Sequence, residues 1–367
     1  MNKKFLILVI VVLGILTIGS WISYFASPDG YQLGLQPKED VSIAITGDVM
    51  FARKMPSVLD SIGSPFKNVE NVTKNVDLLL VNFENPVTTS TEAYKGNVPL
   101  KASPSYIELL KANPNTIAAL ANNHIFDYGE VGLNDTINYL TDNGIKSIGA
   151  GNNKEDATRP IVQEINGRKI VILNYMDQDN FKEYSQSEMP KATNTNENVN
   201  GSSHSGYAAI DWDVVKKDIE ANKEGADIVL VYLHFGNEYS HAPNDHQKDI
   251  SKKFIDYGAD IVVGSHTHVT EGVEIYKNKP IFYSLGNFIF DQSNPDTHSA
   301  MFLELNLVND TCEVTVHPIY ISNYLPKFMS PSDGKTLLNG LTPKDSALKI
   351  TENGKGKLTF PLGSSSE

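Results

Sequence analysis

Short apolar runs separated by polar, turn-forming segments dominate the chain from residue 41 onward. Runs of this length, rich in Val, Ile and Leu and bounded by glycine or polar residues, predict buried strands of a parallel sheet. They lie at residues 41–46, 77–81, 116–120, 227–233 and 260–263. Segments with helical spacing alternate with them, at residues 104–111, 133–140, 213–223 and 245–257. This alternation predicts an α/β fold.

Further strands are predicted outside this alternating part. A hairpin is expected over residues 161–173, with the turn Asn-Gly-Arg at 166–168. Later β-rich segments are expected to form a second sheet packed on the first, and they lie at residues 272–276, 280–284, 301–307 and 313–319. The polar stretch at 177–206 is expected to be a mobile loop. A more specific alternative is that this loop covers a substrate as a lid. From about residue 326 the chain is weakly patterned.

The N-terminal residues have a different pattern. Lys3 and Lys4 precede a long charge-free apolar run. Its length is sufficient to cross a bilayer, with the lysines on the cytoplasmic side. A cleaved signal peptide is the alternative, but Tyr24 stands where a cleavage site needs a small residue. We therefore expect an uncleaved membrane anchor over residues 1–26, a linker over residues 27–40, and a main domain outside the cytoplasmic membrane.

Composition and charge narrow the possible partners. The 367 residues are 40% hydrophobic and 20% charged, as in an ordinary globular protein. The formal net charge of −13 argues against binding nucleic acid or anionic lipid headgroups, since both require a positive surface. Cys312 is the only cysteine, which excludes an intrachain disulfide and a thiolate-rich zinc site. An anionic ligand would need a local positive centre, which a bound metal could supply.

Side chains that commonly bind metals follow five of the predicted strands at their carboxyl ends. They are Asp48, Glu84, Asn123 with His124, His234, and His266 with His268. In α/β sheets, sites form beyond the carboxyl ends of the strands. Oxygen and imidazole ligands without sulfur suit Mn, Zn, Fe or Mg. Each residue alone also fits a turn, a cap or a buried structural histidine, but the combination predicts a site for one or two divalent metal ions.

The histidines at 266 and 268 have two geometric interpretations. If the chain stays extended beyond the strand, residues two apart point to the same side. If the chain turns, the two rings can instead aim at neighbouring points of one site, as ligands of adjacent metal ions would.

Six short motifs along the chain, taken in order, resemble those of a known family. They are Ile-Thr-Gly-Asp at 45–48, Val-Asn-Phe-Glu-Asn-Pro at 81–86, Ala-Asn-Asn-His at 121–124, His-Phe-Gly-Asn-Glu at 234–238, Gly-Ser-His-Thr-His at 264–268 and Ser-Leu-Gly-Asn at 284–287. This order resembles the calcineurin-like metallophosphoesterase pattern and, more closely, the CapA or PgsA family of capsule and poly-γ-glutamate synthesis proteins. The resemblance covers residues 41–320. It implies a metallophosphatase-like four-layer α/β/β/α sandwich over residues 41–325, preceded by one N-terminal transmembrane helix and followed by an extension at 326–367.

The resemblance also implies roles for the residues of these motifs. Glu84 corresponds to a carboxylate that bridges two metal ions. Around it, the first ion would have Asp48 and His268, and the second would have Asn123, His234 and His266. His124 corresponds to the histidine that protonates the leaving oxygen.

Two departures from the family pattern argue against phosphodiesterase activity, and the first of them leaves the first metal site one ligand short. Met50 stands where an additional histidine ligand is usual, and a thioether is a poor ligand for a hard dication. Glu84 replaces the more frequent aspartate, which lengthens the bridge by one methylene. Glu238 is expected as a further ligand or base, and Arg53 and Asn287 as contacts to an anionic substrate.

For function, the resemblance implies a membrane-anchored, extracytoplasmic subunit of a poly-γ-glutamate (capsule) synthesis and export complex. It would act on the polyglutamate chain with an ATP-dependent ligase subunit and an integral membrane subunit. The sequence contains no Gly-x-x-x-x-Gly-Lys-Ser/Thr loop, so the ATP-dependent chemistry is expected from the partners. A free-standing extracytoplasmic metal-dependent phosphoesterase is the alternative, and a catalytically silent docking module is the second. A polyanion would have to be contacted at the metal and at nearby Lys or Arg side chains, because the net charge repels it elsewhere.

Overall fold

The computed structural model describes residues 38–94, 98–178, 204–343 and 346–362. From Asp40 onward the chain belongs to one compact unit. The predicted membrane anchor, most of the linker and most of the loop at 177–206 lie outside the described residues. None of the described helices is long and apolar enough to cross a lipid bilayer.

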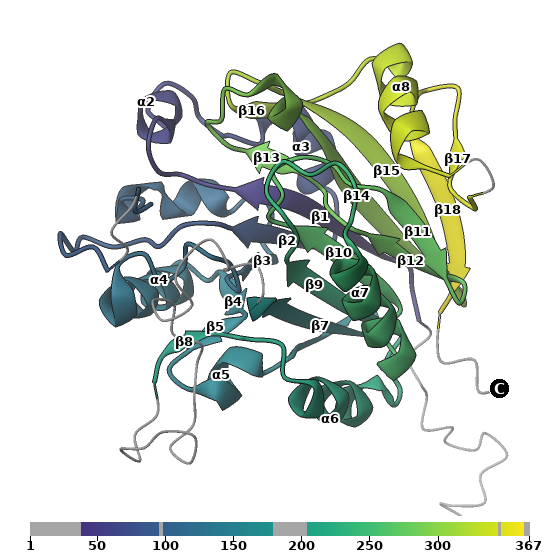
Figure 1. The fold of residues 1–367 in the computed structure, drawn as a ribbon, viewed down its shortest axis with the longest axis horizontal. Helices are drawn as coiled ribbons and strands as arrows, with labels where there is room; N and C mark the ends of the chain where they lie inside the picture. The colour runs from purple at the N-terminus through teal and green to yellow at the C-terminus, as the bar shows by residue number, and fades with distance from the viewer. Residues whose placement is uncertain (1–37, 95–97, 179–203, 344–345, 363–367) are drawn as a thin grey trace, which may run out of the picture. The chain divides into compact units, whose positions relative to one another are not determined.

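A large mixed sheet contains ten strands (Figure 1). Its strands lie in the order β17-β18-β15-β14-β1-β2-β3-β4, with β13 paired to β1 and β16 paired to β15. The bounds are β1 Val41–Val49, β2 Leu78–Phe83, β3 Thr116–Ala119, β4 Lys146–Ile148, β13 Asn287–Ile289, β14 Ser299–Val308, β15 Thr311–Ser322, β16 Leu325–Phe328, β17 Lys349–Ile350 and β18 Gly356–Pro361. Strands β1 to β4 are parallel, so their carboxyl ends lie at one edge.

A second sheet contains six strands in the order β11-β12-β10-β9-β7-β6. Their bounds are β6 Ile161–Ile165, β7 Arg168–Met176, β9 Ile228–His234, β10 Ile261–Ser265, β11 Val273–Tyr276 and β12 Lys279–Phe282. The four inner strands are parallel, while β6 and β11 pair antiparallel at the two edges. A separate short pair consists of β5 (Ala150–Gly151) and β8 (Gly206–Tyr207).

The two sheets pack face to face through alternate apolar side chains. Ile43 and Ile45 of β1 belong to the same buried cluster as Leu230 of β9. Ala44 and Val231, their neighbours in sequence, belong to the other buried cluster. Because successive strand residues point to opposite faces, the first cluster lies between the sheets and the second on their outer faces.

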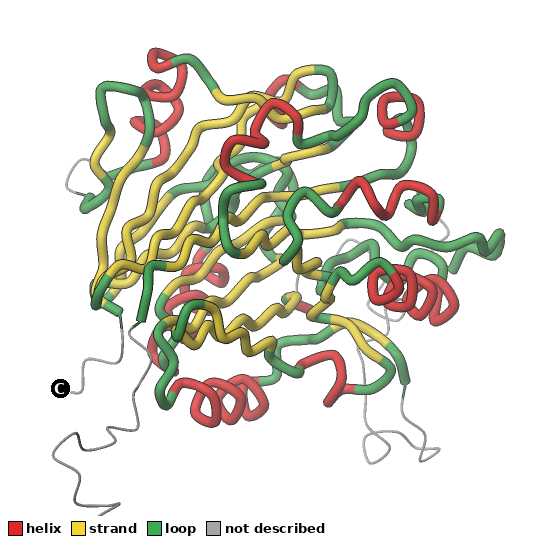
Figure 2. The backbone as a smooth tube through the Cα atoms, turned by 180° about the vertical axis from the view of Figure 1, so that it is seen from behind, coloured by secondary structure: helices red, strands yellow, loops and turns green. Residues whose placement is uncertain are grey.

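Helices cover these outer faces, and Figure 2 shows the strands gathered between them. Val215 and Phe254, from two helices, lie in the same cluster as Val231, and Leu133 of a third lies there with Leu79. The α-helices are α2 Met55–Leu59, α3 Glu70–Thr73, α4 Gly129–Asp142, α5 Lys154–Thr158, α6 Trp212–Lys223, α7 Asp245–Tyr257 and α8 Pro331–Leu341. Short 3-10 helices are η1 Lys67–Val69, η2 Pro104–Leu110 and η5 Pro295–His298. The order of layers is therefore helix, sheet, sheet, helix.

The predicted mixed α/β class is confirmed, and several elements fall where the pattern placed them. The helix predicted at 245–257 has the same bounds in the structure. It begins with a reciprocal cap between Asn244 and Gln247 and ends at Gly258, whose φ of 117° is the left-handed stop that glycine allows. The hairpin predicted over 161–173 is the β6–β7 pair.

The distribution of strands between the sheets differs from the expectation of an early sheet and a late sheet. The predicted strands at 227–233 and 260–263 belong to the second sheet, whereas those at 301–307 and 313–319 join the large sheet beside β1. Most of these strands are buried on both faces. Their continuous apolar runs consequently carry no information about which sheet they enter.

Among the described residues from 325 onward, three strands belong to the large sheet. Strand β18 pairs antiparallel with β15, and β16 forms a hairpin with β15. Leu358 and Phe360 of β18 are buried, while Lys357 and Thr359, which alternate with them, are exposed. This alternation spans a single short strand that ends at Pro361, so it was too brief to stand out in the sequence.

Candidate metal centre

A β-bulge in β1 turns Asp48 toward the space between the two sheets. Ile45 pairs with Leu80 of β2, but the next partners are Asp48 and Asn82, so β1 advances three residues while β2 advances two. Ile45 and Leu80 face the second sheet. The extra residue on β1 therefore places Asp48 on that same face, where regular alternation would have turned it outward.

Gly47 makes this bulge possible. A Cβ at this position would lie 1.8 Å from the carbonyl oxygen of Gly286, and the amide of Asp48 donates to that oxygen at 3.1 Å. Only a residue without a side chain allows the two backbones to approach this closely.

Two fully buried carboxylates lie side by side at the ends of β1 and β2. The side-chain nitrogen Nδ2 of Asn82 donates to Asp48 Oδ1 at 2.7 Å and lies 3.3 Å from Glu84 Oε2. The other oxygens, Asp48 Oδ2 and Glu84 Oε1, are buried and have no hydrogen-bond donor among the described residues. Burial, and next the nearby Asp48 carboxylate, raise the pKa of Glu84 well above its usual value. Without a cation, this pair is costly to keep charged.

Imidazoles from the second sheet face these carboxylates. His234 ends β9, and its Nε2 lies 3.1 Å from Asn123 Oδ1 and 3.1 Å from His266 Nδ1. Burial, followed by the neighbouring histidines, holds the pKa of His234 well below its usual value, which favours the neutral imidazole that binds metals. Ser265 Oγ lies 3.1 Å from the other ring nitrogen of His234 and fixes the orientation of the ring.

His268 also lies beside the carboxylates. Its Nδ1 is 3.0 Å from Asn287 Oδ1 and 3.4 Å from Asp48 Oδ2, and its Nε2 is 4.0 Å from Glu84 Oε1. The chain turns after β10, with a φ of 95° at His266 and 60° at His268. The turned arrangement is thus the one found, and two left-handed residues so close together are a strain typical of functional sites.

The structure brings together all six predicted metal ligands, which we call the ligand cluster: Asp48, Glu84, Asn123, His234, His266 and His268. One ligand atom each from Asp48, Glu84 and His234 lies within 4.8 Å of the others. Asn123, His234 and His266 contact one another, while His268 lies beside Asp48 and Glu84. The buried oxygens without donors and the neighbouring imidazoles fit a divalent cation.

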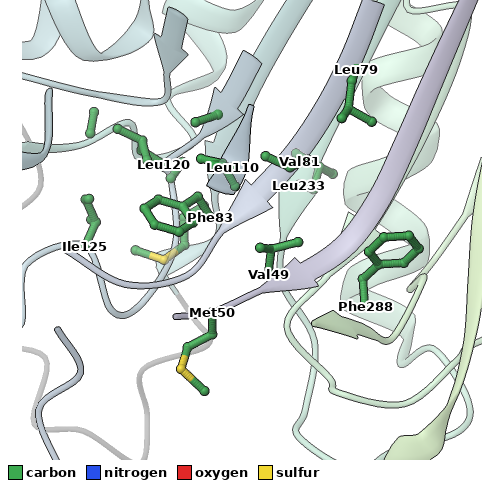
Figure 3. Close-up of a cluster of buried hydrophobic side chains, with 14 of the residues drawn as sticks. Val49, Met50, Leu79, Val81, Phe83, Leu110, Leu120, Ile125, Leu233 and Phe288 are labelled. Carbon is green, nitrogen blue, oxygen red and sulfur yellow. The ribbon is translucent and has the colours of Figure 1, made fainter. Parts of the chain in front are cut away.

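Met50 takes no part in this cluster. It is fully buried and belongs to the apolar cluster on the outer face of the sheets. Figure 3 shows it at the end of β1 among other buried apolar side chains, including Val49 and Phe83. Asp48 and His268 consequently have no second histidine beside them at the position where the family pattern would place one.

His124 lies at the exposed margin of the site and is oriented by an aspartate that the sequence did not single out. Its Nδ1 is 2.7 Å from Asp127 Oδ2, an oxygen that also accepts the backbone amide of Leu100 at 2.7 Å. The His124 side chain is 13% exposed, whereas that of Asp127 is 1% exposed. The spacing of three residues across a turn was the available signal. Such a pair holds the imidazole in one orientation.

The other predicted site residues lie in three different settings. Glu238 is half-buried, and its charge contributes to the raised pKa of Glu84. Asn287 pairs with Asp48 across β13 and β1 and contacts His268, so it supports the ligand cluster directly. Arg53 forms an ion pair with Asp291 and keeps 34% of its side chain exposed. Their predicted roles toward a substrate stay predictions.

A further buried carboxyl, that of Glu271, supports a prediction about pH. Burial raises its pKa to about 7, although Gln247 donates to its Oε2 at 2.7 Å. Because the folded protein retains this proton above pH 4.5 and the unfolded chain releases it, the contribution to stability is lost as the pH rises to about 7. We expect a loss of about 3 kcal/mol that levels off above about pH 7.

Glu271→Gln should remove this pH dependence. The free energy of unfolding of the variant, relative to that of the original protein, is expected to rise between about pH 5 and about pH 8 in urea denaturation. Glu164→Gln, on an exposed position of β6, is the matched control. A difference that stays constant with pH in Glu271→Gln would contradict the expectation.

Comparisons with known proteins agree with the motifs. Residues 42–292 match the family model described as bacterial capsule synthesis protein PGA_cap. The chain is 33% identical over 332 residues to the PGA biosynthesis protein CapA of Bacillus subtilis (strain 168), covering 88% of this chain and 82% of that protein. It is 30% identical over 320 residues to the capsule biosynthesis protein CapA of Bacillus anthracis, covering 84% and 74%. A solved structure of a hypothetical protein from Thermus thermophilus superposes with a TM-score of 0.45 at 14% identity, covering 78% of this chain and 96% of that one, which is too distant to indicate chemistry.

Proposed function

Because this chain belongs to the family of bacterial capsule synthesis proteins, as its motifs predicted, we propose that it acts in the synthesis of a poly-γ-glutamate capsule. The proposal includes anchoring by residues 1–26 and a main domain outside the cytoplasmic membrane, where the polymer is exported. It also includes an ATP-dependent ligase subunit and an integral membrane subunit as partners. The charge-free run near the N-terminus supports the anchor, and the lack of a phosphate-binding loop in the sequence supports the need for a ligase.

The observation that carries the proposal is the agreement between the family match and the buried site. The match over residues 42–292 contains every residue of the ligand cluster. A fully buried pair of carboxylates is expensive for the fold, and it is maintained here beside buried imidazoles. The metal site is therefore proposed as part of the capsule function.

The test is deletion of the gene in its capsule-forming host. Surface γ-linked polyglutamate, measured after acid hydrolysis, is expected to disappear and to return when the full-length gene is restored. Wild-type amounts of polymer in the deletion strain would contradict the proposed function.

A second candidate function, metal-dependent phosphoester hydrolysis, is favoured by the His124–Asp127 pair at the margin of the ligand cluster. Under this candidate function, the two facing sheets and their outer helices would form a metallophosphatase-like sandwich. The ligand cluster would hold a divalent cation, which supplies positive charge for phosphoryl oxygens and a more acidic bound water. Asp127 would orient His124, and His124 would give its proton to the leaving oxygen.

Hydrolysis can be tested with the purified full-length protein, a generic phosphodiester and added manganese. His124→Ala is expected to lower the rate by about 100-fold, because general acid catalysis contributes at least that much. His241→Ala, an exposed histidine outside the ligand cluster, is the matched control. Metal binding without cleavage of any phosphoester would exclude this function and favour a docking module.

A further inference from the structure

A pocket of about 470 Å³ opens beside the ligand cluster and is lined in part by Arg53, Lys54, Tyr239 and Gln292. Phe290 connects the two regions. The Arg53 guanidinium carbon lies 5.2 Å from the centre of the Phe290 ring, and the ring of His268 lies 4.8 Å from the same centre. Tyr239, which is 47% exposed, has its ring 6.0 Å from that of His268. A ligand in this pocket would therefore lie next to the proposed metal position.

The pocket is lined by two positive side chains, those of Arg53 and Lys54, and by one carboxylate, that of Asp291. Asp291 is buried and pairs with Arg53, but one carboxylate cannot use all five N–H groups of a guanidinium. Lys54 is exposed, and no carboxylate lies within 4 Å of its Nζ among the described residues. Its Nζ lies 5.9 Å from the centre of the Tyr324 ring. The pocket thus offers two cations to an anionic ligand.

Cations and aromatic rings continue from the pocket along the hairpin of β15 and β16, which lies beside β13 in Figure 1. His298 Nε2 lies 3.2 Å from the carbonyl oxygen of Gln292, and its ring lies 6.0 Å from that of Tyr320. Tyr320 pairs in register with Lys327, whose Nζ lies 5.2 Å from the tyrosine ring. We call Lys54, Tyr324, Tyr320, Lys327 and His298 the basic-aromatic strip.

The strip has little acidic charge to neutralise it. Lys327 is exposed and, like Lys54, has no carboxylate within 4 Å of its Nζ in the part of the chain that the structure describes. The exposed Asp296 on η5 is close in sequence to His298, and its Oδ2 lies 4.0 Å from Nε2 of His241, which is outside the strip. In a protein with a formal net charge of −13, two lysines without a carboxylate partner reduce the repulsion that a polyanion meets.

We propose that the pocket and the basic-aromatic strip together bind a chain of γ-linked glutamate units, an inference that rests on the proposed function. Arg53 and Lys54 take carboxylates in the pocket, and Lys327 takes a carboxylate further along the chain. The methylene groups between the amides lie over Tyr320 and Tyr324, as apolar segments do on aromatic rings. A chain is favoured over a single small anion because Lys327 lies on β16, beyond the residues that line the pocket.

The test measures binding of a fluorescent γ-linked glutamate oligomer to the purified full-length protein by fluorescence anisotropy. Lys54→Gln combined with Lys327→Gln is expected to weaken binding by about tenfold, since each lysine contributes a charge-assisted contact. Lys349→Gln combined with Lys357→Gln removes the same charge from exposed positions of β17 and β18 and is expected to change binding by less than about twofold. Equal losses in the two double variants, or no loss in the first, would overturn the proposal.

A second ligand tests whether carboxylates are recognised. The same oligomer with its carboxylates converted to amides is expected to lose binding to the original protein, and unchanged binding would overturn the proposal. Failure here is distinguishable from failure of the proposed function. If the deletion strain keeps its polymer while binding still depends on Lys54 and Lys327, the function fails and the site stands. If deletion removes the polymer while binding ignores both lysines, the site fails and the function stands.

Discussion

Gly47→Ala is expected to prevent the protein from folding to its native state at about 37 °C. The added methyl carbon would lie 1.8 Å from the carbonyl oxygen of Gly286, which is backbone and cannot move aside as a flexible side chain can. Either β1 or the segment before β13 must shift, and both carry the hydrogen bonds that join them. We expect a loss of more than about 3 kcal/mol, at the upper end of what overpacking costs.

Gly63→Ala is the matched control for this change. A Cβ at position 63 meets nothing within 4 Å, so this substitution should be neutral or slightly stabilising. The measurement is the midpoint of urea unfolding, together with soluble yield. If the free energy of unfolding of Gly47→Ala lies within about 1 kcal/mol of that of the original protein, the bulge tolerates a side chain and the expectation is wrong.

The second large effect is a difference between two histidine variants in metal content. His266→Ala should reduce metal affinity by about 100-fold or more, because His266 contacts His234, which in turn contacts Asn123. Substitution of groups that only support metal ligands already costs about 10- to 100-fold. His268→Ala should cost less, about tenfold, because Met50 would leave an ion held by Asp48 and His268 one ligand short.

Metal content of the purified full-length variants, measured by mass spectrometry of the ions, checks this difference. His241→Ala is the control, since this exposed histidine lies outside the ligand cluster. Two bound ions in the original protein would fit a bridging Glu84, and one ion would fit a single position shared by Asp48, Glu84 and His234. Equal loss of metal from the two variants would contradict the assignment of His266 and His268 to different ions.

The position of the ligands could be predicted from the sequence because it depends on strand ends. His234 is the last residue of β9, and Glu84 directly follows β2, as the end of each apolar run indicated. Parallel strands bring such ends to one edge, whichever sheet they enter. The wrong division of strands between the two sheets therefore did not affect the predicted cluster.

Other features of the site could not be predicted because they depend on contacts between distant segments. Asn82 holds both carboxylates, but in the sequence it is one polar residue inside an apolar strand. The bulge at Gly47 depends on the backbone at Gly286, far along the chain. Asp291 limits Arg53 to part of its donors, and only the fold brings these two residues together.

The ligand cluster joins two layers that otherwise meet through apolar side chains. Asp48, Glu84 and Asn123 come from the large sheet, while His234 and the two histidines after β10 come from the second sheet. A cation held by both groups makes its own affinity depend on the spacing between the sheets. Such coupling is reciprocal: the free energy by which a bound metal favours one spacing equals the free energy by which that spacing favours metal binding. A partner that binds an outer helix and changes the spacing would therefore also change the metal affinity.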